Sequence, residues 1–393
     1  MKELFYKGLK NPHKVPPFLI RKSLNYYTRN KYSNLVHDSA ELKSVANNYW
    51  ELPDNTDGLN ASLAERIAPG GDSVRIKKTP NFVFTNPFVC EVNDVILSGP
   101  YAAGKTPQGK YIEDMIGRPI SHGNRYSQVS RTITSEWNLY KKTTQPQSVT
   151  QLATAAVIHR ASGSQNFYHW MIDHILKLRA IEFYERKTGD DVKLIVSEHI
   201  PGFAREAIDL LGFGNHSIIE WKENKMSVDK LIVPSWPDPT PGNLHWIESK
   251  IRCETNEFGD KEWVYISRQN ASRGRKVANF DELTPILNDF GVEVIYCEEY
   301  SLEEQIELFR SVDGVISPHG AGLTGMIWTD SLSIIELFNG IVKMPFYVLA
   351  DILEHEYSYL IGEAVTDQNH RGVRDRDLVI DPDNFENILE KQL

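Results

Sequence analysis

Cysteine is scarce in this sequence, which has only Cys90, Cys253 and Cys297 in 393 residues and no CxxC pair. This spacing excludes a disulfide framework and a cysteine-based metal or redox motif, and it fits a reducing compartment. Long apolar runs are also missing. No stretch approaches the roughly 20 residues that span a bilayer, and residues 1–30 lack the apolar core of a signal peptide. We therefore expect a soluble, cytoplasmic protein.

Positive charge is scarce over most of the chain, which carries 43 Lys and Arg against 53 Asp and Glu, a net charge of -10. Residues 1–36 are the exception, with eight Lys or Arg and one acid interleaved with aromatic and aliphatic side chains. Two interpretations of this segment stay open. It lies on an anionic membrane surface, at the inner face of the membrane, or it packs against the acidic body. The acidic remainder would repel nucleic acid, so we expect no such partner.

Apolar strand patterns alternate with helical patterns from residue 155 onward, which indicates βαβ units and parallel sheets. Four prolines in "PSWPDPTPGN", residues 234–243, interrupt the alternation and predict a domain boundary. The predicted fold class is therefore α/β, with two Rossmann-type parallel-sheet domains facing a cleft. The expected divisions are a basic N-terminal arm at 1–60, an acceptor-side α/β domain at 61–235, a nucleotide-binding α/β domain at 236–375 and a tail at 376–393.

Glycines concentrate in "GVISPHGAGLTGMIWTD", residues 314–330, between a predicted strand and a short predicted helix from Leu323 to Trp328. Glycines in such a turn let backbone N–H groups approach a phosphate, and a helix N-terminus favours its negative charge. The hexapeptide "GAGLTG" also matches the dinucleotide fingerprint G-x-G-x-x-G, which keeps an NAD-dependent oxidoreductase as an alternative. The context disfavours it, because the helix is short and the first strand acid, Glu336, follows Gly320 by only 16 residues.

Basic and polar side chains gather where strands of the second predicted domain end. Ligands of parallel sheets bind at the carboxyl ends of the strands, where an arginine can hold phosphate oxygens through two bonds. The turn at 319–322 adds an imidazole and backbone N–H groups, and an acid near the end of "SIIELF" could accept bonds from ribose hydroxyls. This combination favours a nucleotide-diphosphate sugar. The candidate donor-binding residues are Arg268, Arg275, Lys276, His319, Gly320, Ala321, Gly322 and Glu336, with Arg273 as a further cation.

The sequence resembles glycosyltransferase family 61 in five segments that occur in order: "NFYHWMID" at 166–173, "YISR" at 265–268, "RKVANFDEL" at 275–283, "SLEEQIELFRSVDGVISPHGAGLTG" at 301–325 and "IIELF" at 334–338. The resemblance implies a GT-B fold, an inverting mechanism and a UDP-linked sugar donor held mainly by the C-terminal domain. It implies transfer of a hexose or pentose to a glycan, a polysaccharide such as a capsule, or a lipid-linked acceptor. It also places "CEEYSLEEQ" near the donor, which adds Glu299 and Gln305 to the candidates.

An inverting transfer needs a base for the acceptor hydroxyl, and the helical pattern of "NFYHWMIDHILKL" offers one. His169 and Asp173 are four residues apart, so on a helix they share a face and can touch. A carboxylate beside an imidazole orients it and raises its basicity, so we predict that one of the two is the base and the other its partner. His174 points about 100° away from Asp173 and is the weaker candidate. A structural role also stays open, because an apolar stripe buries the same helix.

We expect no metal ion and no cofactor apart from the donor substrate. A metal-dependent glycosyltransferase would need a D-x-D motif after a mid-chain strand, whereas "DRD" and "DPD" lie in a polar C-terminal stretch and are interpreted as turns. Cations and a helix N-terminus can stabilise the departing diphosphate instead. Besides the oxidoreductase, an inactive sugar-nucleotide-binding protein remains an alternative, which the His169, Asp173, Arg268 and His319 set disfavours.

Overall fold

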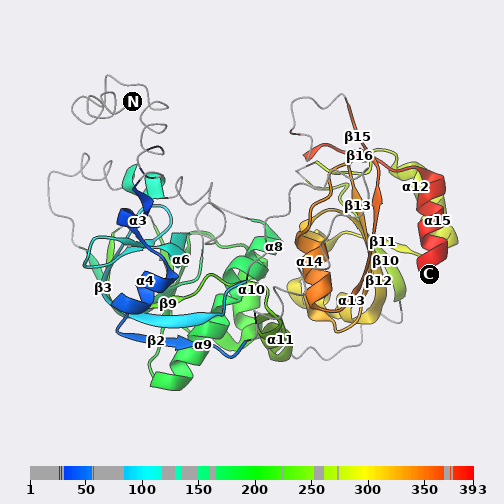
Figure 1. Ribbon diagram of the computed structural model, residues 1–393. Helices are drawn as coiled ribbons and strands as arrows, with labels where there is room; N and C mark the ends of the chain where they lie inside the picture. Colours follow the sequence, from blue (N-terminus) through cyan, green and yellow to red (C-terminus); the bar gives the residue numbers. More distant parts are fainter. Residues whose placement is uncertain are drawn as a thin grey trace. The chain divides into compact units, whose positions relative to one another are not determined.

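The chain divides into two compact units, one made of residues 1–54, 85–165 and 169–238 and the other of residues 55–84, 166–168 and 239–393 (Figure 1). The division after Asp238 lies inside the proline-rich segment. The computed structural model describes residues 31–54, 84–116, 129–134, 149–159, 165–222, 225–251, 261–271, 274–366 and 375–393, and the single positions 26, 28, 56 and 372. Most of the basic segment 1–36 and Arg273 lie outside the described residues.

The first unit is built on a mixed sheet, whose described strands run in the order β1-β5-β4-β3-β9-β6-β7-β8, with β2 paired to β3. The strands are β1 (Val36–His37), β2 (Asn48–Glu51), β3 (Phe88–Ser98), β4 (Ala103–Lys105), β5 (Tyr111–Ile112), β6 (Thr150–Val157), β7 (Lys193–Ser197), β8 (Ile218–Trp221) and β9 (Met226–Pro234). The prediction of a parallel sheet is correct from β9 to β8. It is wrong for β3, which pairs antiparallel with β2, β4 and β9.

A short connection explains the antiparallel part of this sheet. β3 ends at Ser98 and β4 begins at Ala103, and so few intervening residues can only join antiparallel neighbours. The helical elements of the first unit are α3 (Tyr32–Leu35), α4 (Ser39–Val45), α6 (Glu113–Ile116), the π-helix η2 (Met171–Ile175), α9 (Lys177–Thr188), α10 (Gly202–Ile208) and the π-helix η3 (Asp209–Phe213). α8 (Phe167–Trp170) begins in the second unit's segment and leads directly into η2.

Residues 36–51, expected within a basic arm, instead belong to the first unit and supply β1, α4 and β2. The reason is apolar burial: Leu42 of α4 is fully buried in the sheet core, and the Tyr49 ring stacks on Phe88 at a centroid distance of 4.8 Å. Burying a leucine or tyrosine side chain stabilises the fold by roughly 1.5–3 kcal/mol. The charged residues around them are thereby held against the body of the unit.

The second unit has a parallel sheet in the order β11-β10-β12-β13-β14. Its strands are β10 (Lys261–Ile266), β11 (Glu293–Ile295), β12 (Val312–Pro318), β13 (Ser333–Phe338) and β14 (Glu356–Ile361), followed by the antiparallel pair β15 (Glu363–Ala364) and β16 (Leu378–Val379). Its helices are α11 (Pro241–Lys250), α12 (Phe280–Asp289), the 3-10 helix η4 (Cys297–Glu299), α13 (Leu302–Ser311), the 3-10 helix η5 (Ala321–Trp328), α14 (Pro345–Ile352) and α15 (Pro382–Gln392).

Helices cover both faces of this sheet, with α12 and α15 on one side and α13 and α14 on the other (Figure 1). Ile335 and Leu337 of β13 face α12 and α15, in one core with Leu283 and Phe385. Since side chains alternate along a strand, Glu336 is directed to the opposite face. α13 begins with a capping box: Ser301 Oγ accepts from the Glu304 N–H at 3.2 Å, and a Glu304 carboxylate oxygen accepts from the Ser301 N–H at 2.6 Å.

Residues 376–393, expected as a tail, are part of this core. Asp381 caps the N-terminus of α15 by accepting from the Asn384 N–H at 2.9 Å, so "DPD" begins a helix rather than a turn. Phe385 and Leu389 of this helix are fully buried. Of the helices that the structure describes, none is long and apolar enough to cross a membrane.

Candidate active site

The strand order of the second unit reverses between β10 and β12. From β10 the chain goes outward to β11, and then crosses to β12 on the other side of β10, from where β13 and β14 follow outward. Ligands of open α/β sheets bind outside the carboxyl ends of the strands at such a reversal. Arg268 follows β10 and His319 follows β12, so the fold brings two predicted donor-binding residues to this point.

The Arg268 side chain lies directly over Gly320. A Cβ atom at Gly320 would be 2.3 Å from Arg268 Nη1, so any other residue there would require the guanidinium to shift. Arg268 Nη2 donates to the Gly274 carbonyl at 3.3 Å. Burial, and then the like charge of Arg275, lowers the pKa of Arg268 to about 10, which leaves it charged at neutral pH. A partly buried guanidinium held in this way can bind an anion, which would neutralise its charge.

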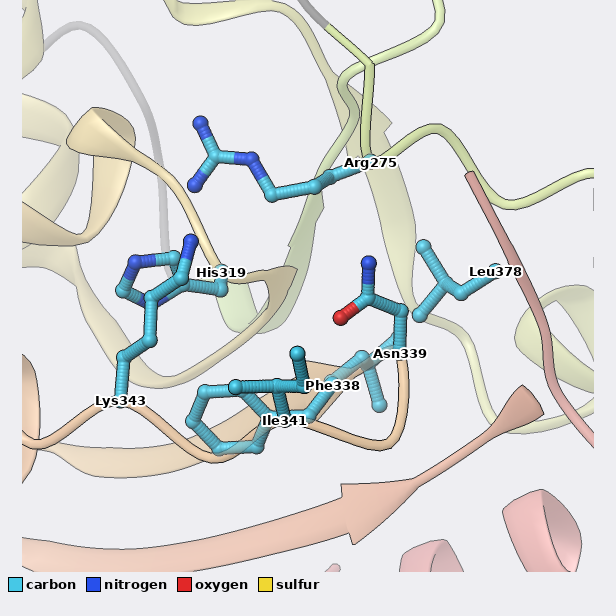
Figure 2. Close-up of a pocket in the computed structure, with 8 residues that line it drawn as sticks. Arg275, His319, Phe338, Asn339, Ile341, Lys343 and Leu378 are labelled. Carbon is cyan, nitrogen blue, oxygen red and sulfur yellow. The ribbon is translucent and has the colours of Figure 1, made fainter. Parts of the chain in front are cut away.

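A pocket of about 190 Å³ opens beside His319 (Figure 2). Figure 2 shows the Arg275 guanidinium, the Lys343 ammonium and the Asn339 amide directed into the same space as the imidazole. Its walls are completed by Leu337, Phe338, Ile341 and Leu378. The cations at this pocket suit an anionic group of a ligand.

Arg275 has a positive φ of 75°, a left-handed conformation that is costly for a residue with a long side chain. Such strain persists only where the surrounding structure imposes it, and here it accompanies a guanidinium at the pocket wall. The strained backbone thus coincides with the candidate site.

Burial and three positive charges act on His319 at the pocket. Burial comes first and the charges of Lys343, Arg275 and Arg268 follow, and together they lower the pKa of His319 well below its usual value. The His319 ring is therefore neutral at neutral pH, and Nδ1 contacts Glu336 Oε1. The positive charge of the site resides on the guanidinium and ammonium groups.

The glycines of "GAGLTG" serve packing. Gly322 faces the Ile266 side chain and Gly325 the Phe309 ring, and added Cβ atoms would approach these side chains to 2.9 and 2.0 Å. The residues from Ala321 to Trp328 form a 3-10 helix, whereas a dinucleotide fingerprint opens a full α-helix. The His319 N–H donates to the Leu337 carbonyl at 2.9 Å, so it does not serve an anion as predicted.

Gly325→Ala is expected to destabilise the protein by about 1–3 kcal/mol, because the new Cβ would overlap the buried Phe309 ring. Gly202→Ala is the matched control, since nothing lies within 4 Å of an added Cβ there and alanine favours the helix. Urea unfolding followed by circular dichroism measures both. Equal unfolding free energies for Gly325→Ala and the unsubstituted protein would show that this glycine has another role.

Three predicted donor-binding residues are engaged elsewhere or stand apart. Lys276 Nζ donates to the Gln269 carbonyl at 2.5 Å, which ties the ends of the loop after β10. The Gln305 amide donates to the carbonyls of Cys297 and Tyr300, at 2.9 and 3.2 Å, and thereby holds η4 against α13. Glu299 is exposed at the end of η4. Their side chains thus have structural explanations or face solvent.

Lys343 and Asn339 line the pocket and were missed in the sequence. Both follow β13 in "FNGIVK", so the rule that selected Arg268 after β10 could have selected them. Tyr357 was also missed. Its hydroxyl donates to Glu336 Oε2 from the neighbouring strand β14, at 2.5 Å, and no local signal in the sequence marks this pairing.

In the first unit, the helix that carries His169 and Asp173 changes from α to π geometry. α8 ends at Trp170, η2 covers Met171–Ile175, and α9 runs from Lys177 to a left-handed Gly189 cap. Single-turn π segments within helices occur often at functional sites. The π segment contains Asp173 and begins two residues after His169.

His169 Nδ1 lies 2.8 Å from Asp173 Oδ2, a contact that the four-residue spacing predicted. The His169 side chain is 47% exposed and that of Asp173 is 14% exposed, so the carboxylate is the inner partner. The contact with Asp173 orients the half-exposed imidazole. His174 is buried, and its ring meets Trp170 edge to face at 4.8 Å, consistent with its lower ranking.

The parallel strands of the first unit also reverse their order, between β6 and β9. His159 follows β6 there, and the buried Lys177 lies over the Trp236 ring after β9, 5.5 Å from its centroid. Burial lowers the pKa of His159 to about 4 and raises that of the neighbouring buried Asp114, which accepts from the Trp236 N–H at 2.8 Å. The sequence did not reveal these buried polar groups.

Across the described ranges, His, Cys, Asp and Glu side chains form no group of three or more that could hold a metal ion.

Comparison with known proteins identifies one family. The family model described as Glycosyltransferase 61 matches residues 167–335, a range that includes His169, Asp173, Arg268 and His319 and ends one residue before Glu336. The chain is 21% identical over 364 residues to the β-1,2-xylosyltransferase XAX1 of Oryza sativa subsp. japonica, covering 80% of this chain and 63% of that protein. It thus spans less than two thirds of the length of this relative.

One solved structure aligns with part of the chain. The iron-containing dodecameric glycosyltransferase TibC from enterotoxigenic E. coli H10407 aligns with 50% of this chain and 60% of its own, at 10% identity and a TM-score of 0.28. This score is too low to establish a common arrangement of domains.

Proposed function

Residues 167–335 belong to glycosyltransferase family 61, and from this premise we propose that the chain transfers a sugar from a nucleotide-diphosphate sugar to a hydroxyl group. The acceptor would be a glycan, a polysaccharide or a lipid-linked saccharide. The name of the rice relative makes a UDP-linked pentose the first donor to examine, with hexoses next. A GT-B arrangement and an inverting mechanism are part of the same proposal.

The observation that carries the proposal is the gathering of Arg268, Arg275 and Lys343 around His319. Three cations at the carboxyl ends of parallel strands match the negative charge of a diphosphate. They would also stabilise the charge that develops on the diphosphate as the sugar departs. No metal ion is required by this scheme, because the positive charge is supplied by side chains.

The reaction would proceed by direct displacement. The acceptor oxygen forms a bond to the anomeric carbon of the sugar while the bond from that carbon to the diphosphate oxygen breaks. The proton of the acceptor hydroxyl passes to His169 Nε2, and the electron pair of the broken bond stays on the diphosphate. Asp173 accepts the Nδ1–H of His169, and so would orient the ring and stabilise its protonated form.

The experiment that tests this function is a thermal-shift series with UDP, GDP, CMP, NAD and NADH, each with and without EDTA. We expect UDP to raise the melting temperature equally in both conditions. A ligand at a hundredfold excess over its Kd stabilises the folded state by about 2.7 kcal/mol. A shift with NAD or NADH alone would support the oxidoreductase instead, and loss of the UDP shift in EDTA would refute metal independence.

A nucleotide shift without transfer would support the inactive binding protein. Transfer is therefore measured separately, by release of UDP from UDP-xylose and UDP-hexoses in the presence of short xylan, glucan and galactan oligosaccharides. Hydrolysis of the donor without acceptor gives the background.

A further inference from the structure

Glu336 lies at the centre of β13 with a side chain that is 0% exposed. Its two carboxyl oxygens have different partners. Oε1 contacts His319 Nδ1 at the end of β12, and Oε2 accepts the Tyr357 hydroxyl from β14 at 2.5 Å. Three neighbouring strands thus contribute one side chain each to a buried chain of hydrogen bonds, Tyr357–Glu336–His319, which reaches the pocket through the imidazole.

This arrangement disagrees with the predicted role of Glu336 in binding ribose. A carboxyl group without exposed surface, whose two oxygens already have partners inside the protein, does not contact a ligand in the pocket. Its influence on a ligand must pass through His319. With Nδ1 turned to Glu336, Nε2 is the ring nitrogen that remains for the pocket, and the state of Glu336 determines whether Nε2 carries a proton.

We propose that Glu336 is a positioning residue that keeps the proton of His319 on Nε2, so that the imidazole donates a hydrogen bond to a diphosphate oxygen of the donor, and that Tyr357 positions the Glu336 carboxyl group. This inference rests on the proposed function, because it specifies how the same pocket holds its anion. It assigns roles to two residues beyond the segment that matches the family.

The surroundings of His319, Glu336 and Tyr357 determine which of these three side chains carry a proton. His319 faces Lys343, Arg275 and Arg268, and it is neutral. Burial raises the pKa of Glu336 to about 8, against the bond from Tyr357 and the charges of Lys343 and Arg275, which lower it. The Tyr357 hydroxyl has a raised pKa, through burial and then Glu336, with Tyr359 and Tyr347 alongside, so it stays protonated and donates.

Below pH 8 the Glu336 carboxyl group is therefore protonated and donates its O–H to His319 Nδ1. The single proton of the neutral imidazole then resides on Nε2, where it can meet a phosphate oxygen. Above pH 8 the ionised Glu336 accepts Nδ1–H instead, and Nε2 presents a lone pair. A lone pair and a new negative charge both repel a diphosphate, so affinity for the donor decreases as pH rises through the pKa of Glu336.

Calorimetric titration with UDP between pH 7 and 9.5, at constant ionic strength, measures this dependence. We expect the affinity of the unsubstituted protein to decrease by up to about tenfold per pH unit above pH 8, the limit for one linked proton. Glu336→Gln should show no such decrease, because an amide does not ionise. It should bind UDP well at pH 7, since the amide can also donate to Nδ1.

Tyr357→Phe should shift the dependence of UDP affinity on pH toward higher pH. Losing the hydroxyl removes a bond that favours the ionised carboxylate, so the decrease should begin at higher pH. Tyr359→Phe, which removes a hydroxyl from an exposed residue of the same strand, is the matched control and should follow the unsubstituted protein. If Glu336→Gln fails to fold, the titration of Tyr357→Phe still tests the proposal. A Tyr357→Phe curve identical to that of the unsubstituted protein would overturn the proposal.

Nitrogen-15 NMR of histidine-labelled protein without nucleotide separates this inference from the proposed function. The chemical shifts of His319, assigned with His319→Gln, report which ring nitrogen is protonated. We expect Nε2–H at pH 7 and a change to Nδ1–H above pH 8. This result without UDP binding would support the relay and refute the donor site. UDP binding together with Nδ1–H at pH 7 would refute the relay alone.

Discussion

Replacing His169 by alanine is expected to lower kcat for sugar transfer by about 10²- to 10⁴-fold, the usual contribution of a positioned general base. The affinity for UDP should stay within about twofold, because uniform binding of the donor does not involve the base. The reason lies in the geometry: Asp173 orients the His169 ring through Nδ1, and the half-exposed ring can be reached by the acceptor hydroxyl. Steady-state kinetics with saturating donor and acceptor provide the measurement.

Asp173→Asn distinguishes the two residues of this pair. If His169 is the base, asparagine preserves the position of the ring but removes the charge that stabilises its protonated form, and kcat should again decrease. If Asp173 is the base, Asp173→Asn should abolish turnover while His169→Ala retains much of it. His199→Ala, at a side chain that is 86% exposed, is the control for loss of a histidine. Near-normal turnover in both His169→Ala and Asp173→Asn would exclude this helix as the source of the base.

Arg268→Ala is expected to weaken UDP binding by at least about 30-fold, equivalent to about 2–5 kcal/mol for truncating one member of a desolvated charge pair. The guanidinium stands at the strand reversal between β10 and β12, and Gly320 leaves the space it occupies. Calorimetric titration at two salt concentrations tests this, because the loss should persist at high salt if the contact is desolvated.

Two further variants sharpen the Arg268 experiment. Arg268→Lys keeps the charge but loses the planar fork, so it should recover only part of the affinity. Lys391→Ala removes an exposed cation near the end of α15 in the same unit and should leave UDP binding unchanged. Equal effects of Arg268→Ala and Lys391→Ala would mean that only the net charge of the unit matters, and that this strand reversal does not hold the nucleotide.

Strong local patterns could be interpreted without the structure. The capping box at Ser301 and Glu304, the strand "SIIELF" and the contact between His169 and Asp173 depend on residues close in sequence. Their geometry follows from helix and strand periodicity alone. The parallel sheet of the second unit followed in the same way, from apolar strands alternating with helices.

The glycines of "GAGLTG" could not be interpreted correctly from the sequence, for a physical reason. A glycine has no side chain to reveal its neighbours, so the sequence does not distinguish a phosphate turn from a site of close packing. Only the structure shows that Gly320 accommodates Arg268 and that Gly325 accommodates Phe309. The antiparallel pairing of β3 with β2 and β9 was also missed, because both partners lie far from β3 in the chain.

The sequence by itself determined the alternation of strands and helices, the similarity of residues 167–335 to one family and a set of charged residues at strand ends. The tertiary structure alone decided which of those residues meet. It brought Arg275 and Lys343 to one pocket and enclosed Glu336 between His319 and Tyr357. It also directed the side chains of Lys276 and Gln305 to backbone carbonyl groups, to which they donate hydrogen bonds. Periodicity indicates where a side chain lies along its own element, whereas its partners come from other strands through long-range pairing that no local pattern encodes.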